Sequence, residues 1–164
     1  MVHGQCMKLS DWIGMLDLLI TVKIVTDEQG RQDAFAVRRK VFVDEQGVPL
    51  HLELDEYDTD ATHFVVYDEE DQPIGAGRMR GLVNAHGKIE RICVLPEHRG
   101  KHFGNMIMNT LEEHARENSM KKLLLNAQSY AVPFYEKLGY AVTSPEFMDA
   151  DIPHRAMEKI LKYD

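Results

Sequence analysis

The chain has 164 residues, 44% of them hydrophobic and 28% charged, which is typical of one soluble globular domain with a proper core. The formal net charge of −8 disfavours binding to nucleic acid or to an anionic membrane surface; it would suit a cationic substrate, although many soluble proteins are simply acidic. With two cysteines, Cys6 and Cys93, the chain can form one disulfide at most, as is usual in a reducing cytoplasm.

Residues 1–19 form an extension ahead of the main domain, which we place at residues 20–164. Asp11 and Asp17 interrupt the apolar part of the extension and no small-residue cleavage site follows, so it predicts neither a signal peptide nor a membrane span. Five large apolar residues recur at helical spacing: Leu9, Trp12, Ile13, Leu16 and Leu19. The extension is therefore either an amphipathic helix that packs on the partner subunit of a homodimer or a poorly ordered leader.

Beyond the extension, strand and helix patterns alternate. Runs of β-branched and apolar residues predict strands at residues 18–26, 62–68, 73–81, 86–96, 120–128, 140–144 and 155–161. Spaced apolar residues predict helices at residues 29–45, around 107–115 and at 131–140. In the last helix, Pro133 stands in the first turn and Gly139 marks the end. This order predicts a single-domain α/β fold with a mixed, mostly antiparallel central sheet and helices on both faces.

The stretch VLPEHRGKHFG, residues 94–104, connects a predicted strand to a predicted helix. Gly100 and Gly104 let the backbone turn tightly and approach a ligand, and N–H groups at a helix N-terminus attract anions. Arg99 and Lys101 add positive charge. The stretch lacks the GK[ST] of a P-loop and the third glycine of a dinucleotide fingerprint. Taken alone, it fits either a phosphate-binding loop or an ordinary surface turn.

The order of these segments gives the loop a context. A strand ending in VLPEHRGKHFG, then a helix, a strand and FYEKLGY, resembles the GNAT family of acyl-CoA-dependent N-acyltransferases over residues 20–161. In that family a Q/R-x-x-G-x-G/A loop holds the coenzyme A pyrophosphate, so the resemblance implies the same fold and acetyl-CoA as co-substrate. The segments VFVDEQGVP, NAQ and DADIPH also resemble a small bacterial branch of ElaA-like proteins.

The resemblance implies a set of coenzyme-binding residues. Backbone groups of Ile92 and Val94 would pair with the pantetheine, and Asn126 and Gln128 would lie near its cysteamine arm. The implied pyrophosphate loop consists of Arg99, Gly100, Lys101, His102, Phe103 and Gly104. His102 stands where the family carries a glycine, and its ring could crowd the pyrophosphate or donate a hydrogen bond to it. Histidine tolerates a positive φ better than most residues, so the loop can still function.

Two residues are candidates for acid–base catalysis. Tyr135, in FYEKLGY, matches the family tyrosine that protonates the departing thiolate; its alternative role is that of a buried core aromatic. Glu90 is our candidate for the base that deprotonates the amine, directly or through water, and it could equally be a salt-bridged strand carboxylate beside Arg91. A backbone N–H near Ile92 would polarise the thioester carbonyl.

The acceptor site is expected beside the end of the first helix. Glu45 and Gln46 lie there, and His154 either lines the acceptor pocket or caps a strand. Residues 53–60, ELDEYDTD, carry five acidic side chains, which either attract a primary amine or polyamine or form a solvated loop.

Cysteine and metal chemistry are disfavoured. Cys93 lies on a buried strand with no histidine placed beside it, which indicates an inert small hydrophobe rather than a covalent nucleophile. His98 and His102 are four residues apart, but Gly100 argues against a helix that would align them on a zinc ion. We therefore expect a cytoplasmic, metal-independent enzyme that moves an acyl group directly from acetyl-CoA to a primary amine or peptide amine. A non-catalytic acyl-CoA-binding or regulatory module of the same fold is the alternative.

Overall fold

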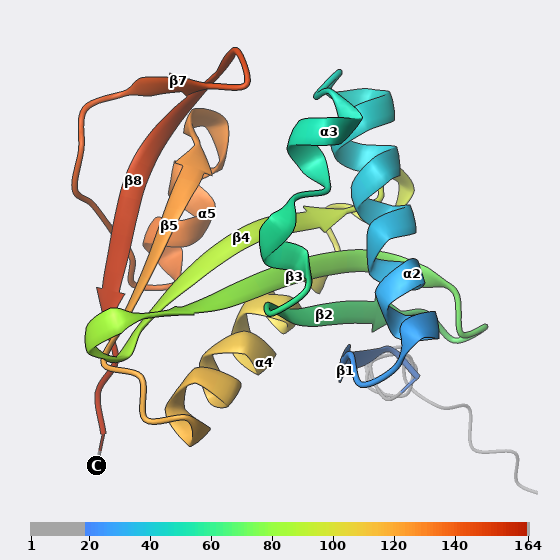
Figure 1. Cartoon of the computed structure of the whole chain (residues 1–164), viewed down its shortest axis with the longest axis horizontal. Helices are drawn as coiled ribbons and strands as arrows, with labels where there is room; N and C mark the ends of the chain where they lie inside the picture. Colours follow the sequence, from blue (N-terminus) through green and yellow to red (C-terminus); the bar gives the residue numbers. More distant parts are fainter. Residues whose placement is uncertain (1–18, 164) are drawn as a thin grey trace, which may run out of the picture.

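The computed structural model describes residues 19–163, which form one sheet with helices on both of its faces (Figure 1). The strands are β1 Thr21–Ile24, β2 Thr62–Tyr67, β3 Pro73–Leu82, β4 His86–Val94, β5 Lys122–Gln128, β6 Ala141–Val142, β7 Phe147–Asp149 and β8 Ile152–Ile160. The helices are α2 Glu28–Arg38, α3 Leu50–Glu53, α4 Phe103–Glu117 and α5 Val132–Lys137, with a π-helix at Arg39–Glu45. The predicted amphipathic helix of the extension lies outside the described residues.

The strand order is β1-β2-β3-β4-β5-β8-β6, with β7 paired to β8. Only the β4–β5 pair is parallel, so the sheet is mixed and mostly antiparallel. Helices α2 and α3 lie on one face of the sheet, and α4 and α5 on the other (Figure 1). The predicted fold class is confirmed.

Local sequence explains the two long helices. The Asp27 carboxylate accepts a hydrogen bond from the Gly30 N–H at 2.8 Å and caps α2, which then widens into the π-helix and stops before Gly47 at φ 74°. In α4, the predicted apolar face is fully buried: Ile107, Met108, Leu111 and Ala115 are all 0% exposed. These helices hold the two faces of the sheet at fixed positions and therefore fix the cleft between the strands.

β4 and β5 are paired only from His86↔Lys122 to Ile89↔Leu125, and the two strands then separate (Figure 1). A bulge begins in β4 at this point: Arg91 has a φ of 62°, and residues 91–92 lie opposite Gly77 of β3. A Cβ on Gly77 would lie only 2.7 Å from Cδ1 of Ile92, so a larger residue would displace the bulge. Because a bulge bends its strand and increases the twist, it directs β4 away from β5.

Two fully buried arginines connect α2 and β3 to the segment after α3. Arg38 contacts Glu53 through Nε at 2.9 Å and Asp58 through Nη1 at 2.7 Å. Arg78 contacts Asp58 at 2.8 Å and Asp55 at 2.6 Å, both through Nη1. Since neither arginine is exposed to water, the carboxylates alone compensate their charges, and removing one carboxylate would leave a buried charge unpaired.

No helix within residues 19–163 has both the length and the apolar character needed to cross a bilayer.

We predict that Asp58→Asn lowers stability and weakens its dependence on acid pH. Burial alone would raise the pKa of Asp58, but hydrogen bonds from Arg38 and Arg78 outweigh burial and hold this pKa well below its usual value. Because the pKa of Asp58 is lower in the folded state, the ionised carboxylate stabilises the fold at pH values above the unfolded-state pKa of about 3.9. This stabilisation is lost as the pH falls from there toward the folded-state pKa. The variant should lose roughly 3–5 kcal/mol of unfolding free energy at neutral pH.

Urea unfolding of both proteins between neutral pH and about pH 2 measures this effect, with the exposed Asp60→Asn as the matched control. The wild type should lose stability more steeply below about pH 4 than Asp58→Asn does. Parallel curves for the two proteins would show that the Asp58 carboxylate carries no such contribution.

Candidate active site

A cleft of about 750 Å³ opens where β4 and β5 separate. Residues of the π-helix end, β3, β4, β5, α5 and the β7–β8 hairpin line it. Ten of the residues predicted for the site line this one cleft: Gln46, Glu90, Ile92, Val94, Arg99, Gly104, Asn126, Gln128, Tyr135 and His154. Glu45, Gly100, Lys101, His102 and Phe103 are not part of its lining.

The loop before α4 presents backbone N–H groups. Gly100 and His102 both adopt the left-handed conformation, with φ of 76° and 64°. His102 precedes the first helical residue, Phe103, and its exposed side chain makes no capping hydrogen bond. Among the described residues, no acceptor is found for the backbone N–H groups of residues 101–105. The loop therefore offers a run of donors at a helix N-terminus, an arrangement that suits an anionic group.

Arg99 connects this loop to the π-helix. Its guanidinium contacts the two Glu45 oxygens at 3.0 and 2.5 Å and donates from Nε to the Val94 carbonyl at 3.0 Å. The hydrogen bond from Arg99 lowers the pKa of Glu45. Glu45 thus lies next to the predicted pyrophosphate loop instead of the acceptor side where the sequence placed it.

Two glutamines from distant parts of the chain face each other across the cleft. Gln128 donates from Nε2 to the Gln46 side-chain oxygen at 2.8 Å, and Gln46 donates back at 3.4 Å. Asn126, two residues earlier on β5, is exposed and has no side-chain partner within residues 19–163. The amide of Asn126 is free for a ligand, whereas that of Gln128 is already engaged.

Tyr135 is buried in the cleft wall on α5. Its ring packs edge-on against Phe134 and Tyr140, with centroids 4.9 and 6.0 Å away. Burial raises the pKa of its hydroxyl far above the usual value, so the group stays protonated. The hydroxyl has no hydrogen-bond partner among the described residues. Phe134 also reaches the loop, since a Cβ on Gly104 would lie 3.2 Å from Cζ of its ring.

Glu90 is held by two arginines. One oxygen pairs with Arg78 and the other accepts from Nε of Arg80 at 2.7 Å. Burial by itself would raise the pKa of Glu90, but these hydrogen bonds and charges lower it. With both oxygens engaged and its basicity reduced, this carboxylate is poorly suited to the predicted role of general base. Its arginine partners are Arg78 and Arg80, not Arg91.

The acidic run at residues 53–60 is neither a solvated loop nor a free anionic patch. It begins at Glu53, the last residue of the short helix α3, and includes a 3₁₀ turn at Glu56–Asp58. Glu53, Asp55 and Asp58 are all bound to arginines. An attraction of polyamines by these three carboxylates is therefore not expected, because their charges are already compensated.

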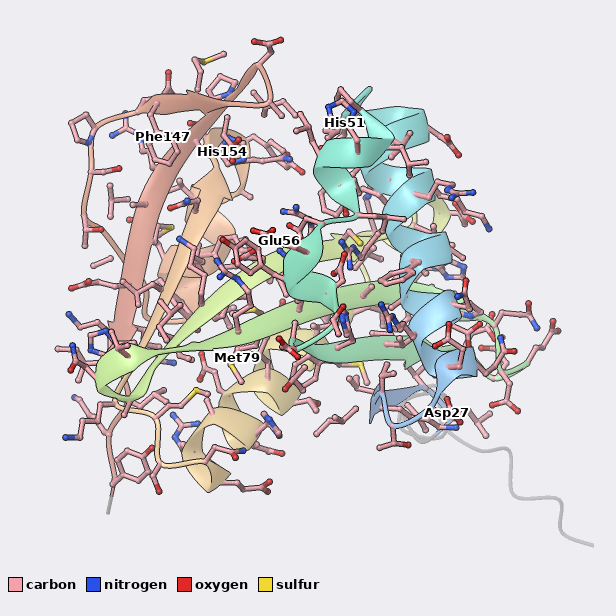
Figure 2. All side chains as sticks on the ribbon, viewed as in Figure 1. Asp27, His51, Glu56, Met79, Phe147 and His154 are labelled. Carbon is pink, nitrogen blue, oxygen red and sulfur yellow. The ribbon has the colours of Figure 1, made fainter. Side chains whose placement is uncertain are left out.

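His154 lies on β8 beside Phe147 of β7, and Figure 2 shows the two side chains next to each other. Their rings are stacked with centroids 6.1 Å apart. Nδ1 of His154 is 2.7 Å from the carbonyl oxygen of Ile152; since a carbonyl only accepts, Nδ1 is the donor. Nε2 therefore has its lone pair available in the neutral ring, and it has no partner within residues 19–163. The orientation of the ring is set by the backbone and by Phe147.

Within residues 19–163, the one cysteine is buried and no cluster of side chains of the metal-binding type is found. Cys93 is 6% exposed, and burial raises the pKa of its thiol to about 12, so it stays an unreactive thiol. No group of three or more His, Cys, Asp or Glu side chains within the described residues could hold a metal ion. Cys6 lies outside them.

Three cationic residues of the cleft were not identified from the sequence: Arg80, Lys88 and Arg91. Lys88 alternates with the buried residues Gly87 and Ile89, as Glu90 does. A period of two along this strand would have placed Lys88 on the same face as Glu90. The left-handed backbone of Arg91 has no sequence signal, because glycine is the usual residue at such a bulge.

Comparison with known proteins agrees with this architecture. The family model for the acetyltransferase (GNAT) domain matches residues 26–161. The uncharacterized N-acetyltransferase YjcF of Bacillus subtilis (strain 168) is 50% identical over 137 residues, which cover 83% of this chain and 96% of YjcF.

Solved structures are similar over nearly the whole domain. A candidate N-acetyltransferase from Lactobacillus plantarum superposes with a TM-score of 0.82 at 28% identity, covering 87% of this chain and 99% of the other. Escherichia coli ElaA superposes with a TM-score of 0.77 at 21% identity, covering 85% and 99%, and shares the fold. From the family match and the identity to YjcF, this chain belongs to the GNAT family of N-acetyltransferases.

Proposed function

We propose that this protein transfers an acetyl group from acetyl-CoA directly to a primary amine, with both substrates bound in the cleft between β4 and β5. The observation that carries the proposal is the early end of β4–β5 pairing beside the N-terminus of α4, which leaves two strand edges facing a cleft of about 750 Å³. Members of this family take the acetyl group from acetyl-CoA. When bound, acetyl-CoA supplies a thioester whose carbonyl carbon accepts the amine.

The chain fits the coenzyme at two places. The backbone N–H groups of residues 101–105 would hold the pyrophosphate, with Arg99 adding charge. The Arg99–Glu45 pair does not prevent this, because both side chains are exposed, at 45% and 36%, and such a pair is worth only ~0.2–1 kcal/mol. The free edge of β4 around Ile92 and Val94 would pair with the pantetheine as an added strand would.

Tyr135 is the proposed general acid. The amine nitrogen bonds to the thioester carbon, the carbon–sulfur bond breaks, and the departing thiolate needs a proton. Tyr135 can donate one because its hydroxyl is protonated, has no partner within the described residues and lies in the cleft wall. The ring contacts of α5 hold the hydroxyl in place, which limits the reorganisation needed during transfer.

His154 is the proposed acceptor of the amine's proton, in preference to Glu90. Its Nδ1–H is committed to the Ile152 carbonyl, which leaves Nε2 as the basic atom in the cleft. Glu90 has both oxygens bound to arginines and a lowered pKa, so a proton there is less favoured. Glu90 would then position Arg80, which lines the cleft, and would stay paired with the fully buried Arg78.

The proposal is tested by titrating acetyl-CoA into the full chain by calorimetry and by following release of the coenzyme thiol with a panel of amines. Tyr135→Phe should bind acetyl-CoA as the wild type does but turn over about 10²–10⁴-fold more slowly, because only the proton donor is removed. Binding without turnover for every amine in the wild type would favour the non-catalytic alternative. Full activity of Tyr135→Phe would remove Tyr135 from the mechanism.

We predict that His154→Gln lowers kcat, since glutamine has no basic nitrogen to accept the proton of the amine. Glu90→Gln should keep most of the wild-type kcat, because both Glu90 oxygens are already bound by arginines. Steady-state rates at saturating acetyl-CoA and amine separate the two assignments. A loss of kcat in Glu90→Gln alone would restore Glu90 as the base.

We predict that the backbone conformation at position 102 matters more for coenzyme binding than the imidazole does. His102→Gly should bind acetyl-CoA within a few-fold of the wild type, because glycine readily adopts the left-handed region. His102→Val should weaken binding by about 5–30-fold, since a β-branched residue is strongly disfavoured in the left-handed region, at a cost of about 1–2 kcal/mol. Calorimetry measures both, and a gain above ten-fold in His102→Gly would show that the imidazole obstructs the pyrophosphate.

A further inference from the structure

The floor of the acceptor side of the cleft is a set of charged side chains on one face of the sheet. Arg80 of β3 lies directly opposite Lys88 of β4, and Glu90 lies opposite Arg78. Since side chains two apart on a strand share a face, Lys88 and Glu90 point to the same side, the one covered by α2 and α3. The Glu90 contacts with Arg78 and Arg80 confirm that these three side chains meet there, and the strand register places Lys88 on the same face.

The carboxylates of this floor are already paired with arginines. Glu90 is bound by Arg78 and Arg80, and Glu53 by Arg38 and Arg91. The remaining lining carboxylate, Asp149, is exposed on β7 and forms no ion pair within residues 19–163. These paired carboxylates leave little capacity to bind an additional cation.

The cations, in contrast, keep spare capacity. Lys88 is half-buried and makes no hydrogen bond or ion pair with any residue that the structure describes, and its partial burial lowers the pKa of its ammonium group. Arg80 stacks on Tyr57 at 3.8 Å and gives Nε and Nη2 to Glu90, but Nη1 has no partner in the described part of the chain. Glu90 attracts Lys88 and Arg80 repels it, but Glu90 is already bound by two arginines, and a half-buried ammonium without a hydrogen-bond partner is unfavourable. An anion bound between Lys88 and Arg80 would reduce the repulsion between the two cations and would give the Lys88 ammonium a partner.

We propose that the acyl acceptor carries, besides its amine, an anionic group of carboxylate or phosphate type, which Lys88 and Arg80 bind. This inference rests on the proposed function, because it concerns the second substrate of the same cleft. The acidic run in the sequence suggested a polyamine, whose additional groups are positively charged. The acceptor proposed here carries a negatively charged group in addition to its amine.

The position of Lys88 also limits the acceptor's length. Lys88 precedes Ile92, the predicted neighbour of the thioester, by four residues, at most about 13 Å along β4 at ~3.3 Å per residue. The flexible lysine stem can cover part of this separation. An amine separated from its anionic group by several bonds therefore fits better than one in which both are attached to a single carbon.

A competing explanation is that Lys88 only attracts Asp149 and thereby steadies the β7–β8 hairpin. Asp149 does act electrostatically on Lys88. In that case Asp149→Asn would have the same effect as removing Lys88, which makes the two explanations separable.

The test compares matched amines in the thiol-release assay with the full chain and acetyl-CoA. The pairs are γ-aminobutyrate with butylamine, O-phosphoethanolamine with ethanolamine, and glycine with methylamine as the short pair. The wild type should favour the anionic member of the longer pairs at least ~10-fold in kcat/KM, because a charge-assisted contact is gained. A preference in the first pair alone identifies a carboxylate, and one in the second pair alone a phosphate.

Lys88→Met should bring these ratios close to one through a higher KM for the anionic amines. The matched control is Lys122→Met, since Lys122 lies on the same face but pairs with Glu158 at 3.4 Å and does not line the cleft. Lys122→Met and Asp149→Asn should both keep the preference. A wild type that prefers neutral amines, a ratio that survives in Lys88→Met, or a ratio lost in Asp149→Asn would each overturn the proposal.

Anion binding is also measured without turnover, so that failure of the catalytic proposal does not hide the result. Inorganic phosphate and hexanoate are titrated into the ¹⁵N-labelled chain, and the backbone amides of residues 80 and 88 are followed by NMR. Saturable shifts in the wild type that are absent in Lys88→Met support the anion site even if no amine is acetylated. Absence of such shifts in the wild type, or equal shifts in both proteins, would overturn it.

Discussion

The short parallel pairing between β4 and β5 is the constraint on which the site depends. The two strands share four residue pairs, from His86↔Lys122 to Ile89↔Leu125, and then separate. Unpaired strand edges normally invite association with other chains. Here they face a cleft that α5 and the end of the π-helix also line, so the hydrogen-bonding groups are available to a ligand.

The separation is maintained by side chains far from β5. Arg91, the left-handed residue of the bulge, contacts the Leu52 carbonyl at 3.1 Å and the Glu53 carboxylate at 3.1 Å. Glu53 is in turn held by the buried Arg38 of α2. A non-glycine residue in the left-handed region costs of order 1–3 kcal/mol and persists only when its surroundings fix it. The arginine–carboxylate network therefore both compensates its own buried charges and supports the bulge that opens the cleft.

Periodicity in the sequence was sufficient for the long elements but not for the short ones. The apolar spacing of α4 and the β-branched strands predicted the architecture, because burying one face dictates that pattern. β7 and α3 were missed, since the three residues of β7 after Pro145 and the four residues of α3 after Pro49 are too short to show a periodic pattern.

Side-chain partners were beyond sequence reasoning for a different reason. The residues taken from the family resemblance mostly line the cleft, because the motifs follow the backbone that forms it. The partner of each residue depends on tertiary geometry. Gln46 and Gln128 are 82 positions apart in the chain, and Glu45 and Arg99 are 54 apart. Nothing in the local sequence of Glu90 indicated that two arginines would engage both of its oxygens.

In the proposed site, backbone groups bind the coenzyme and side chains bind the acceptor. This difference suggests how relatives with the same fold can differ in substrate. On the coenzyme side the donors are backbone N–H groups, which every residue except proline supplies, so a histidine can occupy a position usual for glycine once its φ is accommodated. On the proposed acceptor side the ligand-binding groups are side chains, the donors Lys88 and Arg80 and the proton acceptor His154, and a single substitution changes the charge offered. Under the proposed assignment, coenzyme recognition tolerates sequence change, whereas acceptor choice is sensitive to it. Substrate differences within this fold are therefore expected to lie at the positions of these three side chains.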